Sequence, residues 1–176
     1  STALSLVRQL RTMARVPVTQ SDKSGSQTLV ELKAVMASGA AAYPLYGTAV
    51  LEPAMSLEAA LAIINGISGA VAEPALLARL GVKVGDRLDL GKTQVELRAV
   101  LVSEPDRVSG TFALGPRLMV NNDTLDAAGL MQRGSLVRHN YRMRLAPETD
   151  VKQRREQIDL AFPDMAWRIA DVKTAQ

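Results

Sequence analysis

The chain has 176 residues, of which 47% are hydrophobic and 22% are charged. This composition is typical of a folded globular protein and excludes an intrinsically disordered chain. The net charge of +3 is small, both signs are mixed along the sequence, and only 3% of the residues are aromatic. Neither a phosphate-binding stripe nor a platform for stacked bases is expected, so we expect no nucleic-acid partner.

Cysteine is absent, which excludes disulfides, thiolate metal sites and a cysteine nucleophile, and which suits an oxidising compartment such as the periplasm. Residues 36–51 carry little charge but contain Gly, Pro, Ser and Tyr, and they fall short of the ~20 apolar residues of a membrane span. The chain starts at Ser1 within a patterned segment, without Met or a signal peptide. We therefore expect a piece of a longer protein.

The first part of the chain is predicted to form a β-hairpin followed by a loop. Residues 4–18 follow no single period, which leaves helix and strand open, and we favour a strand. A polar turn at 21–27 leads to residues 30–34, where apolar and charged side chains alternate as in a half-buried strand. Residues 40–53 carry little charge and are predicted to be a loop.

Capping signals predict a short helix after this loop. Ser56 is a typical N-cap residue, and Leu57, Leu61 and Ile64 would share one face of the helix that follows. The Asn-Gly pair at 65–66 is expected to end it.

The middle of the chain is predicted to contain one more helix and several strands. A short strand at 70–72 leads to a helix that begins at Pro74 and ends at Gly81. Alternation over 87–101, interrupted by a turn at 91–92, predicts a hairpin. Another strand is expected at 118–120, followed by a brief helix capped by Asn122 or Asp123.

The last forty residues are predicted to form strand, helix and strand. In the first strand one face would carry Val137, His139, Tyr141, Met143 and Leu145, and the other Arg138, Arg142 and Arg144. Asp150 with Gln153 resembles a capping box for a helix that ends before Pro163, and residues 165–172 are predicted as a closing strand.

These elements predict an α+β fold of two lobes. A split strand-helix-strand unit has to pair with other strands to be stable, and the N-terminal hairpin is the available partner. The two chain ends, residues 1–67 and 134–176, would then form a terminal lobe that encloses an inserted small β-rich lobe, residues 68–133.

Several motifs resemble the periplasmic core domain of MacB/FtsX-like ABC transporter permeases. The longest are L-L-A-R-L-G-V-K-V-G-D-R-L-D-L-G at 76–91 and V-E-L-R-A-V-L-V-S-E-P-D-R at 95–107. Shorter matches are L-V-E-L-K-A-V at 29–35, Y-P-L-Y-G at 43–47, L-G-P-R-L-M-V at 114–120 and G-S-L-V-R at 134–138. Together they are similar to the YbbP-like subgroup, and the order of the motifs is more specific than any one of them.

The resemblance implies a MacB-like periplasmic core domain, with a porter-like terminal lobe and a sabre-like inserted lobe. It implies a location on the periplasmic side of the bacterial inner membrane, a cytoplasmic ATPase as partner, and a second permease copy. A periplasmic protein or a lipid is a further possible partner or substrate. Such a domain transmits ATP-driven movement, and the family offers no catalytic residues to carry over.

The residues themselves point away from an enzyme. Gly91-Lys92-Thr93 lacks the rest of a phosphate-loop pattern and joins two predicted strands. His139 is the only histidine and has no visible partner for catalysis or metal binding. No serine lies in a G-x-S-x-G context. We therefore predict no catalytic, cofactor-binding or metal-binding residues and no cofactor.

Two regions are candidates for partner contact. The first is the low-charge loop with Tyr43, Leu45 and Tyr46, which would form either an exposed apolar patch or a contact between the lobes. The second is the arginine-rich C-terminal part with Arg142 and Arg144, which would face solvent, lipid headgroups or an acidic partner.

The loop at 104–107 carries two carboxylates and a guanidinium. The loop Glu104-Pro105-Asp106-Arg107 is expected to form an internal salt bridge or a turn instead of a calcium site, because two carboxylates are a sparse ligand set.

The alternative to a permease domain is a soluble periplasmic adaptor that binds a lipid or peptide.

Overall fold

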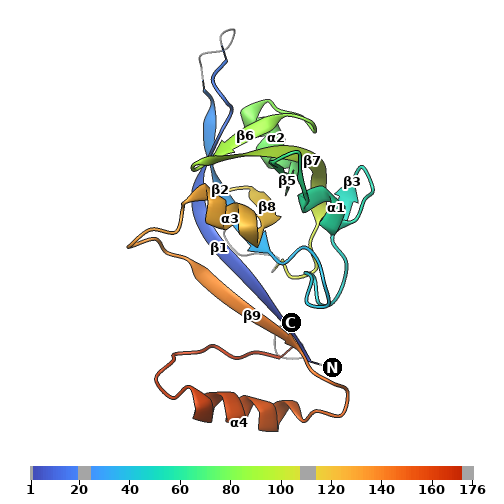
Figure 1. Cartoon of the computed structure of the whole chain (residues 1–176), viewed down its shortest axis with the longest axis vertical. Coiled ribbons are helices and arrows are strands. Elements are labelled where there is room, and N and C mark those ends of the chain that lie inside the picture. Colours follow the sequence, from blue (N-terminus) through green and yellow to red (C-terminus); the bar gives the residue numbers. More distant parts are fainter. Residues whose placement is uncertain (1, 20–24, 108–113, 172–176) are drawn as a thin grey trace. The chain divides into compact units, whose positions relative to one another are not determined.

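The structure is a computed structural model that describes residues 2–19, 25–107 and 114–171 (Figure 1). Its chain divides into two compact units, Leu4–Arg142 and Ser1–Ala3 with Met143–Gln176. The elements in chain order are β1 (Ala3–Arg15), β2 (Gln27–Val35), β3 (Val50–Glu52), α1 (Leu57–Leu61), β4 (Ile63–Ile64), β5 (Ile67–Ala72), α2 (Pro74–Leu80), β6 (Arg87–Leu90), β7 (Thr93–Ser103), β8 (Arg117–Asn121), α3 (Asn122–Ala128), β9 (Arg138–Arg144) and α4 (Val151–Ala161).

Six strands of the larger unit pair in a closed ring. Their order is β7-β6-β1-β2-β8-β5, and β5 pairs again with β7. The β2–β8 and β5–β7 pairs are parallel, and the other four pairs are antiparallel. β3 and β4 extend the sheet at its edges, and β9 pairs with β1. Figure 1 shows the green hairpin of β6 and β7 crossing the blue strand β1.

Both long hairpins agree with the sequence predictions. β1 and β2 pair with Leu10 opposite Leu32, and most of the polar turn between them lies outside the described residues. β6 and β7 pair with Leu90 opposite Thr93, so Gly91 and Lys92 form the turn. The Gly-Lys-Thr sequence is therefore part of a hairpin, as its position between two alternating segments indicated.

The Asn-Gly pair at 65–66 has a different role from the predicted one. Helix α1 ends at Leu61, and the pair forms a two-residue turn between β4 and β5, with Ile64 opposite Ile67. Asn65 and Gly66 have φ angles of 50° and 77°, as the favoured hairpin turns require. The expectation that Ile64 lies on a helix face is wrong, and its side chain is exposed.

The predicted helix caps are confirmed with one shift. Ser56 accepts a hydrogen bond from the Ala59 amide at 3.1 Å, and Pro74 starts α2, which ends at Gly81 in the left-handed conformation. Asp150 caps α4. The prediction of Asn122 or Asp123 as the cap of α3 is wrong, because Asn121 is its N-cap.

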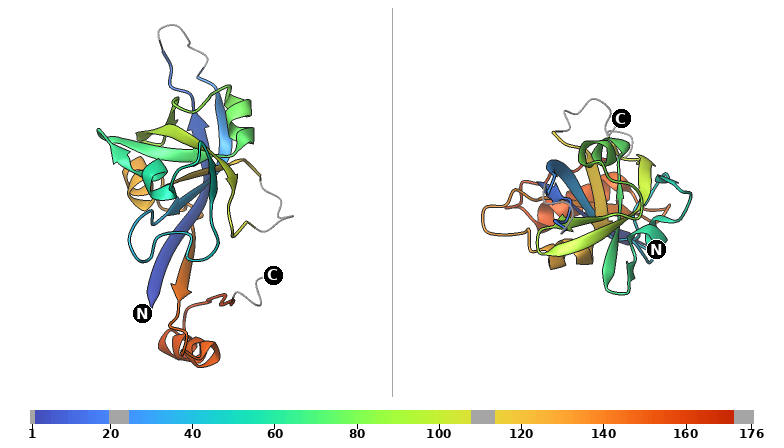
Figure 2. Two further views of the ribbon diagram at one scale, coloured as in Figure 1. Left: turned by 90° about the vertical axis from the view of Figure 1, so that its right-hand side faces the viewer. Right: turned by 90° about the horizontal axis from the view of Figure 1, so that it is seen from above.

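Two hydrophobic clusters hold the larger unit together. The larger one takes residues from all six ring strands and from α2 and α3, among them Leu10, Leu32, Leu76, Leu90, Leu97, Leu118 and Leu125. The second joins α1, β3 and the loop after β2 to the opposite face of the sheet through Val35, Tyr43, Leu51, Leu61, Leu101 and Met119. Figure 2 shows α1 and β3 beside the green strands of the ring. Each fully buried leucine contributes about 1.5–3 kcal/mol.

The smaller unit contains α4, and no described residue between Met143 and Asp171 is buried. The predicted closing strand is wrong for residues 165–171, which form no strand, while Val172 lies outside the described residues. A strand needs a neighbour for its backbone groups, and none of the strands in the described part of the chain pairs with these residues. The alternation predicted for β9 does not bury one face either, since His139, Tyr141 and Met143 are exposed.

The fold is a mixed α+β structure with one large sheet and four helices among the described residues. The two units have other bounds than the expected terminal lobe (1–67 with 134–176) and inserted lobe (68–133), so those lobes stay a prediction about the architecture. None of the helices in the described part is long and apolar enough to cross a membrane.

Candidate functional site

A cluster of ion pairs is buried in the larger unit. At its centre the Lys33 side chain on β2 is 1% exposed. Its Nζ lies 2.9 Å from Glu104 Oε2, 2.8 Å from both carboxylate oxygens of Asp106 and 2.9 Å from the Tyr43 hydroxyl. An ammonium has three donors, so these three groups satisfy it. We use the name Lys33 cluster for Lys33, Tyr43, Glu104, Asp106, Arg117 and Arg142.

Each of the two carboxylates that pair with Lys33 also has an arginine partner. Arg117 Nε donates to Glu104 Oε1 at 2.8 Å, and Arg142 forms an ion pair with Asp106. The Tyr43 hydroxyl also donates to Asp106. Each buried carboxylate therefore has a cation on two sides, which offsets the large cost of removing it from water.

A covering loop explains why a strand lysine is buried. Lys33 lies on the same face of β2 as Glu31 and Val35, the face that the sequence pattern assigned partly to solvent. The loop after β2 covers Lys33, because the ring of Tyr43 lies 4.4 Å from the Lys33 Nζ. Tyr43 itself is 3% exposed, and its amide donates to the Met36 carbonyl at 2.8 Å. The Lys33 cluster thus joins five parts of the chain. These are β2, the loop after β2, the segment between β7 and β8, β8 itself, and β9.

Burial and pairing shift the ionisation of the central groups. Burial lowers the pKa of Lys33 below its ordinary value, although the carboxylates of Glu104 and Asp106 oppose this effect. Burial alone would raise the pKa of Asp106, but the Lys33 ammonium, the Tyr43 hydroxyl and the Arg142 guanidinium hold it below its ordinary value. Burial and the nearby Asp106 charge raise the pKa of Tyr43.

The chemistry that this arrangement supports is structural. A substrate cannot reach an amine that is 1% exposed, and Lys33 does not line the cavity described next. The described residues contain no group of three or more His, Asp or Glu that could hold a metal ion. What the Lys33 cluster can do is fix five chain segments in one arrangement.

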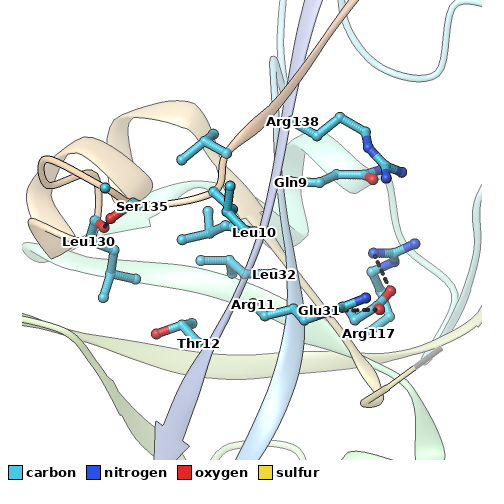
Figure 3. A pocket seen from close by; sticks show the side chains of 13 residues that line it. Gln9, Leu10, Arg11, Thr12, Glu31, Leu32, Arg117, Leu130, Ser135 and Arg138 are labelled. Atoms are coloured by element: carbon cyan, nitrogen blue, oxygen red, sulfur yellow. Dashed lines mark hydrogen bonds and ion pairs between the residues drawn. The ribbon is translucent and has the colours of Figure 1, made fainter.

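A cavity of about 820 Å³ lies along β1 and β2 in the larger unit (Figure 3). One wall carries the polar side chains of Gln9, Arg11, Glu31, Arg117 and Arg138, and Figure 3 shows them on one side of β1. Leu10, Leu32 and Leu130 lie on the other side. Arg117 belongs to both the cavity and the Lys33 cluster.

The residues predicted for partner contact differ in how far they are exposed. Tyr43 and Leu45 are buried, whereas Tyr46 is 47% exposed. Arg142 is half-buried in its ion pair with Asp106, and Arg144 is exposed on β9. Of the predicted set, only Tyr43 and Arg142 belong to the Lys33 cluster, and the contact of this set with a partner stays a prediction.

The sequence indicated one half of the Lys33 cluster and missed the other. The expected internal salt bridge of the 104–107 loop is confirmed by Arg107 Nη1, which lies 3.9 Å from Glu104 Oε1. Glu104 and Asp106 also pair with Lys33, which was not expected. Lys33 itself and Arg117 were missed. Their charged positions in strands are typical of a solvent-exposed face, and no local pattern predicts that Tyr43 and its loop cover Lys33.

One comparison with known proteins gives a relationship. The chain is 31% identical over 100 residues, 57% of its length, to the uncharacterized ABC transporter permease YbbP of Escherichia coli K12. The chain is thus distantly similar to a permease. It spans 12% of that relative's length. No family model matches the chain, and no solved structure matches it.

Proposed function

We propose that the chain is the extracytoplasmic domain of an ABC transporter permease of the MacB/FtsX-like class, on the periplasmic side of a bacterial inner membrane. The observation that carries this proposal is the 31% identity with a permease over 100 residues, which agrees with the order of motifs in the sequence. The domain is non-catalytic and transmits ATP-driven movement. A cytoplasmic ATPase, reached through the membrane part of the permease, and a second permease copy are its partners.

The larger unit has the properties that such a role needs. Force is transmitted well by a body whose segments do not slide past one another, because packed interiors are close to incompressible. The closed ring of strands and the Lys33 cluster both hold distant segments together. The Arg142–Asp106 ion pair ties β9, the strand that leads out of the larger unit, to this body.

Side-specific labelling tests the proposed location. The chain has no cysteine, so Glu58→Cys on α1 and Arg79→Cys on α2, both exposed, are unique labelling sites in a cysteine-free full-length protein. We expect a membrane-impermeant maleimide to label both in spheroplasts without permeabilisation. Ala70→Cys, which is fully buried, is the matched control and should react only after denaturation. Labelling of the exposed sites only in permeabilised cells contradicts the proposal.

The soluble adaptor remains the second candidate, and the cavity is the observation that favours it. The β1–β2 pair divides its volume of about 820 Å³ into a polar and an apolar part, and a ligand of such an adaptor would occupy one of them. Fractionation separates the two functions: a permease stays with the membranes after a carbonate wash, whereas an adaptor is released with the periplasm.

A further inference from the structure

We propose that the polar wall of the cavity is a docking site for an acidic segment of a protein partner. The wall consists of Gln9 and Arg11 of β1, Glu31 of β2, Arg117 of β8 and Arg138 of β9. The proposed ligand is a glutamate or aspartate side chain that projects from the partner into this wall. The inference goes beyond the proposed function, because it rests on the charges of the larger unit alone.

The path of β1 limits what the cavity can bind. Figure 3 shows the charged side chains on one side of β1 and Leu10, Leu32 and Leu130 on the other. Leu10 and Leu32 face each other in the hydrogen-bonded β1–β2 pair, and this pair separates the two sides. A single ligand therefore cannot place its charged end on one side and an apolar tail on the other. The polar wall alone defines the ligand.

The polar wall has more cations than its own acid can neutralise. The wall carries three guanidinium groups, and two of them already have a carboxylate partner. Arg117 is bound to Glu104 at 2.8 Å and lies 3.8 Å from Glu31, and Arg11 lies 3.6 Å from Glu31. Arg138 has no ion pair with any residue in the described part of the chain. An additional carboxylate would supply the missing negative charge.

The polar wall also offers unused hydrogen-bond donors. The Gln9 side-chain amide makes no hydrogen bond to another residue of the described ranges, and it lies beside Arg138 in Figure 3. Guanidinium and amide N–H groups are the donors that carboxylates accept, and the planar arginine fork binds them in pairs. Arg138, Gln9 and Arg11 thus provide a row of donors across the neighbouring strands β9 and β1.

The depth of the wall favours a protein side chain over a membrane surface. At its floor, the Arg117 and Glu31 side chains are 10% and 23% exposed, whereas Arg11 at the rim is 54% exposed. A flat layer of lipid headgroups would meet the rim and leave the floor untouched. A projecting glutamate can enter toward the floor, so that its carboxylate meets Arg117 as well as Gln9 and the two exposed arginines, Arg11 and Arg138.

A binding assay with the full-length protein, purified in the detergent or lipid it needs, tests this site. The probe is a short fluorescein-labelled peptide of alternating glutamate and serine, compared with its glutamine analogue by fluorescence anisotropy. We expect only the acidic peptide to bind, and its affinity to fall between about 0.1 M and about 1 M salt, as the screening length falls from about 10 to about 3 Å. The double variant Arg11→Gln/Arg138→Gln should bind it roughly tenfold more weakly.

A matched variant and two other anions complete the test. Arg79→Gln/Arg87→Gln removes the same charge from exposed positions outside the cavity and should bind the acidic peptide as the unmodified protein does. An equal loss in this control overturns the proposal, as does equal binding of the glutamine peptide. Vesicles of anionic lipid or free succinate that bind through Arg11 and Arg138 while the acidic peptide does not would overturn the protein partner. None of these results depends on the membrane location of the protein.

Discussion

Lys33 shows how one residue can hold several segments of a chain. Its ammonium meets two carboxylates and a phenol within 2.9 Å, and these groups come from two segments, the loop after β2 with Tyr43 and the segment after β7 with Glu104 and Asp106. A buried ion pair contributes little compared with a well-packed apolar group, but removal of one partner leaves an unpaired charge in the interior. The Lys33 cluster should therefore respond strongly to single substitutions.

Replacement of Lys33 should destabilise the domain much more than replacement of an exposed lysine. Lys33→Met leaves Glu104 and Asp106 without their shared cation and is expected to lower the free energy of unfolding by about 3–5 kcal/mol. Lys83→Met at an exposed position should change it by less than about 0.5 kcal/mol. Urea unfolding followed by circular dichroism measures both. If the two variants are equally stable, the Lys33 cluster does not hold the fold.

Acid should weaken the domain through Asp106. The pKa of Asp106 is lower in the folded state than its ordinary value, so the unfolded chain takes up the proton first. The resulting stability is present above the unfolded pKa of about 4 and is lost as the pH falls through the folded pKa. Asp106→Asn should show a smaller loss of unfolding free energy than the unmodified chain on acidification below about pH 4. Parallel pH profiles for the two proteins would show that Asp106 does not cause the loss.

The burial of Lys33 is a feature that its neighbours in sequence do not predict. The alternation around Lys33 correctly predicted which residues of β2 share a face, and the loop with Glu104 and Asp106 correctly suggested an internal ion pair. The burial of Lys33 depends on Tyr43 and the loop after β2, which fold over it from elsewhere in the chain. No pattern within a few residues of Lys33 contains that information.

Among the elements, α1 and β5 approach each other so closely that their contact needs a glycine. A Cβ atom at Gly69 would lie 1.9 Å from the Ala60 carbonyl oxygen and 2.5 Å from Arg98 Nη1. Gly69 also donates its amide to Ala62 at 3.0 Å. The end of α1 can lie over β5 only because position 69 has no side chain.

Substitution of Gly69 should therefore separate α1 from the sheet. We expect Gly69→Ala to lower the free energy of unfolding by about 3 kcal/mol, because the backbone of α1 has to move. Gly66→Ala in the nearby turn meets no atom within 4 Å and should cost about 1 kcal/mol through its positive φ alone. Chemical denaturation of both variants measures the difference. A loss at Gly69 no larger than that at Gly66 would contradict the close contact.

At the element scale, local signals were sufficient for hairpins and caps and insufficient for pairing between distant segments. Ser56, Pro74, Gly81 and Asp150 act as predicted, because a cap involves only a few neighbouring residues. The parallel pairs β2–β8 and β5–β7 bring together segments that are far apart in sequence. The β2–β8 pair joins the N-terminal hairpin to the middle of the chain, and no local pattern predicts such a pairing.

In the proposed transporter, the larger unit is expected to move as one body when ATP is bound. The closed ring of strands and the Lys33 cluster predict that distances within Leu4–Arg142 stay constant during this movement. The proposed second copy supplies the reference point, because movement of a body is visible only relative to another one.

Pulsed electron paramagnetic resonance of the full-length, cysteine-free protein together with the proposed ATPase measures this movement. Spin labels at Glu58→Cys and Arg79→Cys report a distance within the larger unit, and a single label at Arg79→Cys reports the distance between the two copies. We predict that trapping of ATP changes the distance between the copies and leaves the distance within the unit unchanged. An unchanged distance between the copies, or a change within the unit, would contradict the account.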